Sequence, residues 1–150
     1  MNLAMFVANE QHFDPQAVLL LRHGKGKTDA LRRAGATLDE YSLVQPTNTR
    51  YDYLAAGRPP IRCVVIIVDD HVQMVYRIDG IEAEGTTYGL TSEAYIRFDT
   101  QQGSPPVPAR RFLATRLTTS HAIGKRVSGW SSPRTTVARH GGVIWDRAEI

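Results

Sequence analysis

An apolar run followed by a polar turn and an alternating segment is the feature that most constrains the fold of this chain. Arg62 to Val68 (RCVVIIV) is rich in β-branched residues, which favour strands. Val72 to Ile78 carries an apolar side chain at every second position, the period of a strand with one buried face. The polar residues Asp69, Asp70 and His71 between them predict a hairpin turn. We therefore expect an antiparallel hairpin in the middle of the chain.

Short helices are expected before this hairpin. Asp14 and Pro15 are typical of a helix start, with Asp as the N-cap and Pro at the first helical position. The predicted helices span Gln16 to Arg22, Asp29 to Ala34 and Thr49 to Ala56. A glycine within two residues of each predicted end supports these boundaries, because glycine is the usual residue just after a helix.

Further strands are expected after the hairpin. The predicted strands span Ala94 to Phe98, Phe112 to Leu117 and Thr135 to Ala138. A His-Gly-Gly turn then leads into Val143 to Trp145, which predicts a closing hairpin. A chain of 150 residues has room for one ordinary core. The expected fold class is α+β, a single domain over residues 1–150 with short N-terminal helices and a curved sheet or small barrel.

Positive charge is segregated along the chain. Thr100 to Trp145 contains seven basic residues and no acidic one, and Arg22 to Arg33 adds five basic residues against Asp29 alone. The sequence pI is about 9.2. This distribution indicates a polyanion as partner, and nucleic acid is the first candidate. The alternative is that these residues form ordinary solvated faces.

Several classes of protein are excluded by simple features. No apolar run reaches the roughly 18 residues of a membrane span, and the first 20 residues lack a secretion signal. The lone cysteine, Cys63, excludes a disulfide framework, so we expect a cytoplasmic protein. The five histidines show no HxH or HExxH spacing, and we expect neither a metal nor a cofactor.

Two enzyme classes can be compared with Arg22 to Thr28 (RHGKGKT). A phosphate-binding P-loop needs an additional glycine at position 21, where Leu21 stands, so that motif is incomplete. The chain also resembles histidine phosphatases in RHG, in SSP at 131–133 and in HGG at 140–142. That resemblance implies His23 as the phosphoryl-accepting nucleophile. The nearly adjacent later motifs and the predicted helix before RHG argue against it, and phosphoryl transfer stays as an alternative.

The segment PPIRCVVIIVDDHVQMVYRIDGIEAEG (residues 59–85) resembles the central hairpin of PUA-like domains, the group that includes the ASCH, EVE, YTH and SRA folds. SEAYIRFD, PARRFLATRL and GWSSPRTTVAR are most similar to small modified-DNA readers, including the modules that precede HNH nucleases in McrA-type restriction. The resemblance covers roughly Arg58 to Trp145 and implies a small PUA-like barrel. It implies binding of double-stranded DNA that contains 5-methylcytosine, without catalysis. Because the chain has no HNH segment, a separately encoded nuclease is the expected partner.

Basic residues are the expected contacts with the DNA phosphates. They are Arg22, His23, Lys25, Lys27, Arg32, Arg33, Arg110, Lys125, Arg126, Arg134 and Arg139. The glycines around Lys25 are expected to let backbone N–H groups approach phosphates, and the helix predicted after them adds partial positive charge. The RHGKGKT stretch is therefore predicted to be a phosphate site without a reaction.

Recognition of a modified base requires stacking partners and polar groups. The candidates are Trp130, Ser131, Ser132, Tyr41, Tyr51, Tyr88 and Tyr95. Trp130 is the best single candidate, because it lies in a Gly- and Ser-containing loop beside basic residues; the alternative is that it plugs the end of the barrel. An RNA-binding PUA-like domain is the remaining alternative function, since related folds bind RNA.

Overall fold

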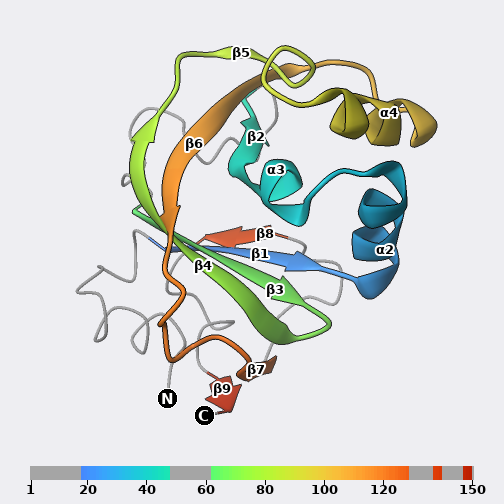
Figure 1. The fold of residues 1–150 in the computed structure, drawn as a ribbon. Coiled ribbons are helices and arrows are strands. Elements are labelled where there is room, and N and C mark those ends of the chain that lie inside the picture. The colour runs from blue at the N-terminus through green and yellow to red at the C-terminus, as the bar shows by residue number, and fades with distance from the viewer. Residues whose placement is uncertain (1–17, 48–61, 129–136, 140–146, 150) are drawn as a thin grey trace. The chain divides into compact units, whose positions relative to one another are not determined.

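The computed structural model describes residues 18–47, 62–128, 137–139 and 147–149. The chain forms two compact units, each assembled from separate segments (Figure 1). Unit 1 comprises residues 1–24, 59–78 and 115–150, and unit 2 comprises residues 25–58 and 79–114. Helices and strands are both present, which confirms the α+β class. In the described part of the chain, no helix is long and apolar enough to cross a membrane.

The centre of unit 1 is a parallel pair of buried strands. β1 (Val18–His23) pairs parallel to β3 (Cys63–Val68), with Leu20 opposite Val65. Their side chains are buried on both faces except at Arg22 and Val68, which are half-buried. A strand that is buried on both faces has a continuous apolar sequence rather than an alternating one. The sequences VLLL and CVVIIV are continuous in this way.

Further strands extend this pair on both sides. β3 pairs antiparallel with β4 (His71–Ile81), and β1 pairs antiparallel with β8 (Val137–Arg139). β7 (Arg126–Ser128) pairs with both β4 and β9 (Arg147–Glu149). β4 and β3 form the predicted hairpin, and the prediction is confirmed.

The turn of this hairpin has an unusual backbone. Val68 pairs with His71, which leaves Asp69 and Asp70 as a two-residue loop. Both have positive φ, 47° and 64°, as a type I′ turn requires. Aspartate tolerates this conformation better than most residues, because its short polar side chain bonds locally to the backbone. The turn predicted at Asp69 and Asp70 is therefore present, and its backbone matches the twist of the strands.

The helix predicted over Gln16 to Arg22 is wrong for the described residues, which form β1. The N-cap and proline at Asp14 and Pro15, on which the prediction rested, lie outside the described residues. From Val18 onward the chain has four consecutive apolar residues and no polar helix face. Pairing with β3 satisfies the backbone and buries those residues on both sides, and this tertiary contact decides the conformation.

Unit 2 contains the three described helices, α2 (Lys25–Ala34), α3 (Leu38–Leu43) and α4 (Glu93–Gln101). Their shared core consists of Leu31, Ala36, Tyr95 and Phe98. The helix predicted from Asp29 to Ala34 is confirmed, although it begins four residues earlier. Gly35 follows it with a φ of 81°, as expected of a residue that ends a helix.

The strand predicted over Ala94 to Phe98 is wrong, because this segment belongs to α4. The Ser92 hydroxyl accepts a hydrogen bond from the Tyr95 N–H at 3.3 Å and so caps the helix. Tyr95 and Phe98, three residues apart, lie on one helix face and are both buried. A strand would have placed them on opposite faces of a sheet.

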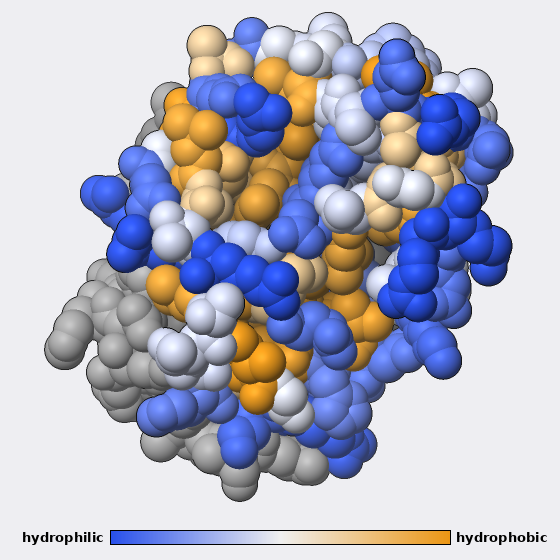
Figure 2. Space-filling model, in the orientation of Figure 1, coloured by the Kyte–Doolittle hydropathy of each residue, from blue (hydrophilic) through white to orange (hydrophobic). Residues whose placement is uncertain are grey.

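Unit 2 also contains three pairings of strands. β2 (Val44–Pro46) and β5 (Gly85–Thr86) pair antiparallel with β6 (Pro108–Arg116), and the Glu82 N–H near the end of β4 donates to the Arg111 carbonyl at 2.9 Å. β6 confirms the strand predicted over Phe112 to Leu117. Leu113 on β6 and Ile81 on β4 are exposed, and Figure 2 shows the apolar surface over β6.

The remaining secondary-structure predictions fall near the edges of the described residues. The strand predicted over Thr135 to Ala138 overlaps β8 at Val137 and Ala138. The helix predicted over Thr49 to Ala56 and the strand over Val143 to Trp145 lie outside the described residues.

The positive φ of Asp69 predicts that a valine at this position destabilises the protein more than a glycine does. Asp69→Val is expected to lower the free energy of unfolding by about 1–2 kcal/mol, because a β-branched residue resists the left-handed conformation. Asp69→Gly is expected to cost far less, since glycine adopts positive φ freely. Urea unfolding of the two variants measures the difference. Equal destabilisation by both would contradict a left-handed backbone at this position.

Candidate nucleic-acid interface

Four predicted phosphate-binding residues from two distant segments, Arg22, His23, Lys125 and Arg126, lie at the turn of unit 1, beside His71, which was not predicted. We call this group the turn cluster: Arg22, His23, His71, Lys125 and Arg126. The Asp69 N–H donates to the carbonyl of His23 at 3.1 Å, which places the end of β1 at the turn. His71 pairs with Arg126, and the Val72 N–H donates to the carbonyl of Lys125 at 2.9 Å. The fold therefore joins residues 22–23 and 125–126 around one turn.

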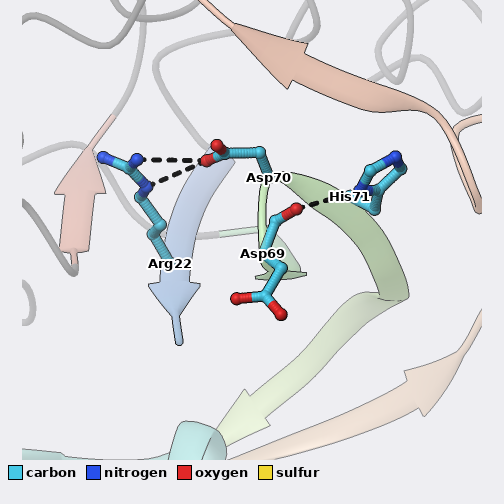
Figure 3. A network of polar contacts seen from close by, with 4 residues as sticks. All are labelled: Arg22, Asp69, Asp70 and His71. Atoms are coloured by element: carbon cyan, nitrogen blue, oxygen red, sulfur yellow. Dashed lines mark hydrogen bonds and ion pairs between the residues drawn. The ribbon is translucent and has the colours of Figure 1, made fainter. Parts of the chain in front are cut away.

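Arg22 is held by an ion pair with the turn. Its Nε and Nη2 atoms lie 3.2 and 3.1 Å from Oδ1 of Asp70, and both side chains are partly exposed (Figure 3). The Asp69 carboxylate points away from Arg22 in the same view. Much of the Arg22 charge is therefore neutralised locally, and this residue fixes the turn relative to β1.

His71 is held by the backbone of the same turn. Its Nδ1 atom lies 2.9 Å from the carbonyl oxygen of Asp69 (Figure 3). A carbonyl oxygen only accepts hydrogen bonds, so Nδ1 carries the proton. The ring is exposed.

The described part of unit 1 is basic. Its described residues include eight lysines and arginines against three acidic residues, Asp69, Asp70 and Glu149. Asp70 is the partner of Arg22, and the described part of this unit retains a clear excess of positive charge. Arg126 is exposed and Lys125 is half-buried. Over its full length, unit 1 has nine lysines and arginines against six acidic residues, so its excess of positive charge is modest.

A second set of predicted cations lies on α2 in unit 2. Lys25, Lys27, Arg32 and Arg33 are all exposed. The first turn of α2 carries two lysines and no acidic residue, the opposite of what the helix dipole favours. Bound anions would relieve this repulsion. Lys27 also donates to the hydroxyl of Tyr41 at 2.8 Å, with its Nζ 5.0 Å from the ring centroid.

The tyrosines named for base recognition take different places in unit 2. Tyr95 is only 5% exposed and packs against Phe98. Tyr41 is half-buried, with its ring 6.1 Å from those of Tyr95 and Phe98. Tyr88 donates to the carbonyl of Ser104 at 2.5 Å. Burial leaves Tyr95 unsuited to stacking on a base.

The other predicted residues lie on β6 and β8 or outside the described residues. Arg110 is a half-buried residue of β6, opposite Gln45 of β2, and its buried Nε has no hydrogen-bond partner among the described residues. Arg139 lies on β8 opposite Leu19. Tyr51, Trp130, Ser131, Ser132 and Arg134 lie outside the described residues.

Sequence reasoning missed the structural role of Asp70. Asp69 and Asp70 were recognised only as turn residues, whereas Asp70, directly after β3, anchors Arg22 of the neighbouring strand. The parallel pairing of β1 with β3 creates this contact, since it aligns His23 with Val68. The recurrence of a buried-type apolar run before both RH and DD is the signal that would have placed the two ends together.

The structure also changes the argument about the RHG motif. His23 ends a buried strand, and α2 begins at Lys25, so the motif lies at a junction between strand and helix. This removes the objection that a helix precedes RHG, although His23 itself is only 7% exposed. Among the described residues, no three His, Cys, Asp or Glu side chains form a group that could hold a metal ion. Comparisons with protein-family models, curated proteins and solved structures gave no match.

Asp99 provides a titratable group beneath the α2 cations. Burial raises the pKa of its carboxyl above the ordinary value, and the charge of Lys27 opposes this rise. Burial and the charge of Asp99 in turn raise the pKa of the Tyr95 hydroxyl. The ionised form of Asp99 is therefore disfavoured by folding, and Lys27 offsets part of that cost.

This arrangement predicts a pH-dependent effect of Asp99→Asn. A folded-state pKa above the unfolded one means that wild-type stability falls as pH rises through the folded pKa. The variant lacks this decrease, so its stability relative to wild type is expected to increase between pH 4 and pH 7. Urea unfolding at the two pH values measures the difference, and a relative stability that falls over this range would contradict the environment described for Asp99.

Proposed function

We propose that this chain binds nucleic acid, with double-stranded DNA containing 5-methylcytosine as its ligand. The observation that carries the proposal is the excess of positive charge in unit 1, which has nine lysines and arginines against six acidic residues, eight against three in the described part. Within that unit, the backbone segments that carry Arg22, Lys125 and Arg126 meet at one turn. Nucleic-acid backbones are the common polyanions that such a distribution attracts.

Lys125 and Arg126 are the proposed phosphate contacts in unit 1. Arg126 is exposed on β7, and the backbone of Lys125 is fixed by its hydrogen bond from Val72. Arg22 has a different role, because its ion pair with Asp70 already engages the guanidinium and holds the turn in place. In unit 2, the lysines in the first turn of α2 add a separate anion-attracting surface.

The preference for a methylated base rests on the resemblance to PUA-like modified-DNA readers. That resemblance spans residues 59–85, 92–99, 108–117 and 129–139, and it implies a non-catalytic module that acts with a nuclease encoded elsewhere. Tyr41 and Tyr88 remain the described aromatic candidates, since both are half-buried rather than buried. An RNA-binding domain is the closest alternative within the same class of fold.

Binding to matched duplexes tests both levels of the proposal. We expect fluorescence anisotropy to show tighter binding of a short duplex with 5-methylcytosine than of its unmethylated counterpart, and weaker binding of an RNA duplex of the same sequence. Affinity should fall steeply between 50 and 200 mM salt, because phosphate contacts release counterions. Equal binding of both DNA duplexes would overturn methyl recognition, and failure to bind any duplex would overturn nucleic-acid binding.

Substitutions in the turn cluster test the proposed contacts. Lys125→Ala combined with Arg126→Ala should weaken binding to every sequence and reduce the salt slope by roughly 0.9 for each phosphate that is no longer neutralised. Asp70→Asn should tighten binding, since it removes negative charge beside Arg22. Arg97→Ala, at an exposed arginine of α4, is the matched control and should leave binding nearly unchanged. If the control weakens binding as much as the double variant, the turn cluster is not the contact surface.

Phosphoryl transfer by His23 is a second candidate, favoured by one observation. RHG lies where a buried strand meets a helix, as the resemblance to histidine phosphatases requires. In this candidate His23 accepts the phosphoryl group and Arg22 holds its oxygens. Hydrolysis of p-nitrophenyl phosphate that is abolished in His23→Ala would support it. Hydrolysis that is absent, or unchanged in that variant, would exclude it for this substrate.

A further inference from the structure

Unit 2 contains a hollow that the proposed nucleic-acid contacts do not use. Its volume is about 520 Å³, within the range of small-molecule sites in proteins. The start of α3, the loop over residues 89–92 and part of β6 form its walls. All of these residues belong to unit 2. Figure 2 shows apolar surface over β6 beside hydrophilic surface over α3 in this part of the molecule.

One wall of the hollow carries two carboxylates, Asp39 and Glu40, in the first turn of α3. The Thr37 hydroxyl caps this helix by accepting from the Glu40 N–H at 3.2 Å. The Glu40 carboxylate accepts from the backbone N–H of Ser92 and, at 2.9 Å, from its hydroxyl. Each carboxylate oxygen has a further lone pair, so Glu40 is oriented without being saturated.

The single cation of the lining is already neutralised. Nη2 of Arg111 lies 2.6 Å from Oε1 of Glu82, and Nη1 donates to the carbonyl of Leu90 at 3.2 Å. The guanidinium therefore serves to join β6 to the end of β4 and to the loop at Leu90. With Arg111 engaged by Glu82, the acidic side chains Asp39 and Glu40 make the described lining attractive to a cation.

The rest of the lining is largely apolar. Val44 and Phe112 are 4% and 2% exposed, and Leu43 and Leu90 are half-buried beside them. These side chains offer an aliphatic and aromatic surface to the body of a ligand. The apolar surface favours a ligand with an apolar body. The carboxylates favour a charged donor group on the same ligand, because they can accept charge-assisted hydrogen bonds from it.

We infer that this hollow binds a small organic cation, with an ammonium or amidinium group on a compact apolar body. The carboxylates of Asp39 and Glu40 take the charged group, and Leu43, Leu90 and Phe112 contact the body. An anion is repelled by the same carboxylates, and a neutral ligand gains no ionic attraction from them. The inference is independent of nucleic-acid binding, whose polyanionic ligand has the opposite charge.

Benzylamine is a suitable probe because it joins a primary ammonium to one apolar ring. Titration of the full chain, followed by protein-observed NMR, should show saturable shifts for residues of the hollow. Benzyl alcohol and benzoate, which have the same ring but neutral or negative head groups, should bind at least about tenfold more weakly. Equal binding of benzyl alcohol, stronger binding of benzoate, or no saturable shift with benzylamine would overturn the inference.

Charge-removing variants locate the cation. Asp39→Asn and Glu40→Gln keep the shape of each side chain, and each is expected to raise the dissociation constant of benzylamine about tenfold. Asp29→Asn, which removes an equal charge from α2 outside the hollow, should leave the constant unchanged. Equal weakening by Asp29→Asn would show that the general charge of unit 2, rather than this hollow, attracts the probe. Amide NMR spectra of each variant confirm that its fold is retained.

Discussion

The parallel pairing of β1 with β3 is the contact on which the rest of unit 1 depends. Two apolar runs separated by about forty residues lie side by side with almost all of their side chains buried. Parallel strands cannot be joined by a tight turn, so the intervening chain must cross over, and α2 begins directly after β1. The same alignment brings His23 to Asp69 and Arg22 to Asp70. The pairing of the apolar strands β1 and β3 thus positions the polar residues of the turn.

Local patterns in the sequence were sufficient for some elements. The hairpin of β3 and β4 is specified by an apolar run, a polar turn and an alternating strand, all within twenty residues. Gly35 marks the end of α2, because the residue that ends a helix often has a positive φ and glycine adopts it readily. β1 and α4 were assigned to the wrong type. Val18 to Leu21 is apolar without periodicity, and only its distant partner makes it a strand. Ala94 to Phe98 has few residues, and the packing of Tyr95 and Phe98 on α2 and α3 decides for a helix.

The candidate sites show the same division. Basic residues were recognisable from the sequence because charge needs no partner to be counted, and Lys125 and Arg126 indeed lie near Arg22 and His23. The sequence does not reveal which basic residues are already paired. Asp70 pairs with Arg22, Tyr41 with Lys27 and Glu82 with Arg111, and each pair forms only in the folded chain. The hollow of unit 2 was missed for a related reason: Asp39, Leu90 and Phe112 come from three separate segments. The turn cluster lies in unit 1 and the negatively lined hollow in unit 2, although unit 2 also carries the exposed cations of α2.

The burial of Cys63 makes its reactivity a measure of how often the folded protein opens. This thiol lies at the start of β3, opposite Val18, and burial raises its pKa to about 12. Only the thiolate reacts readily with alkylating reagents, so the folded protein resists modification at its one cysteine. Labelling requires an opening of the fold that exposes the sulfur to water. The alkylation rate of the native protein therefore measures how often the structure around Cys63 opens.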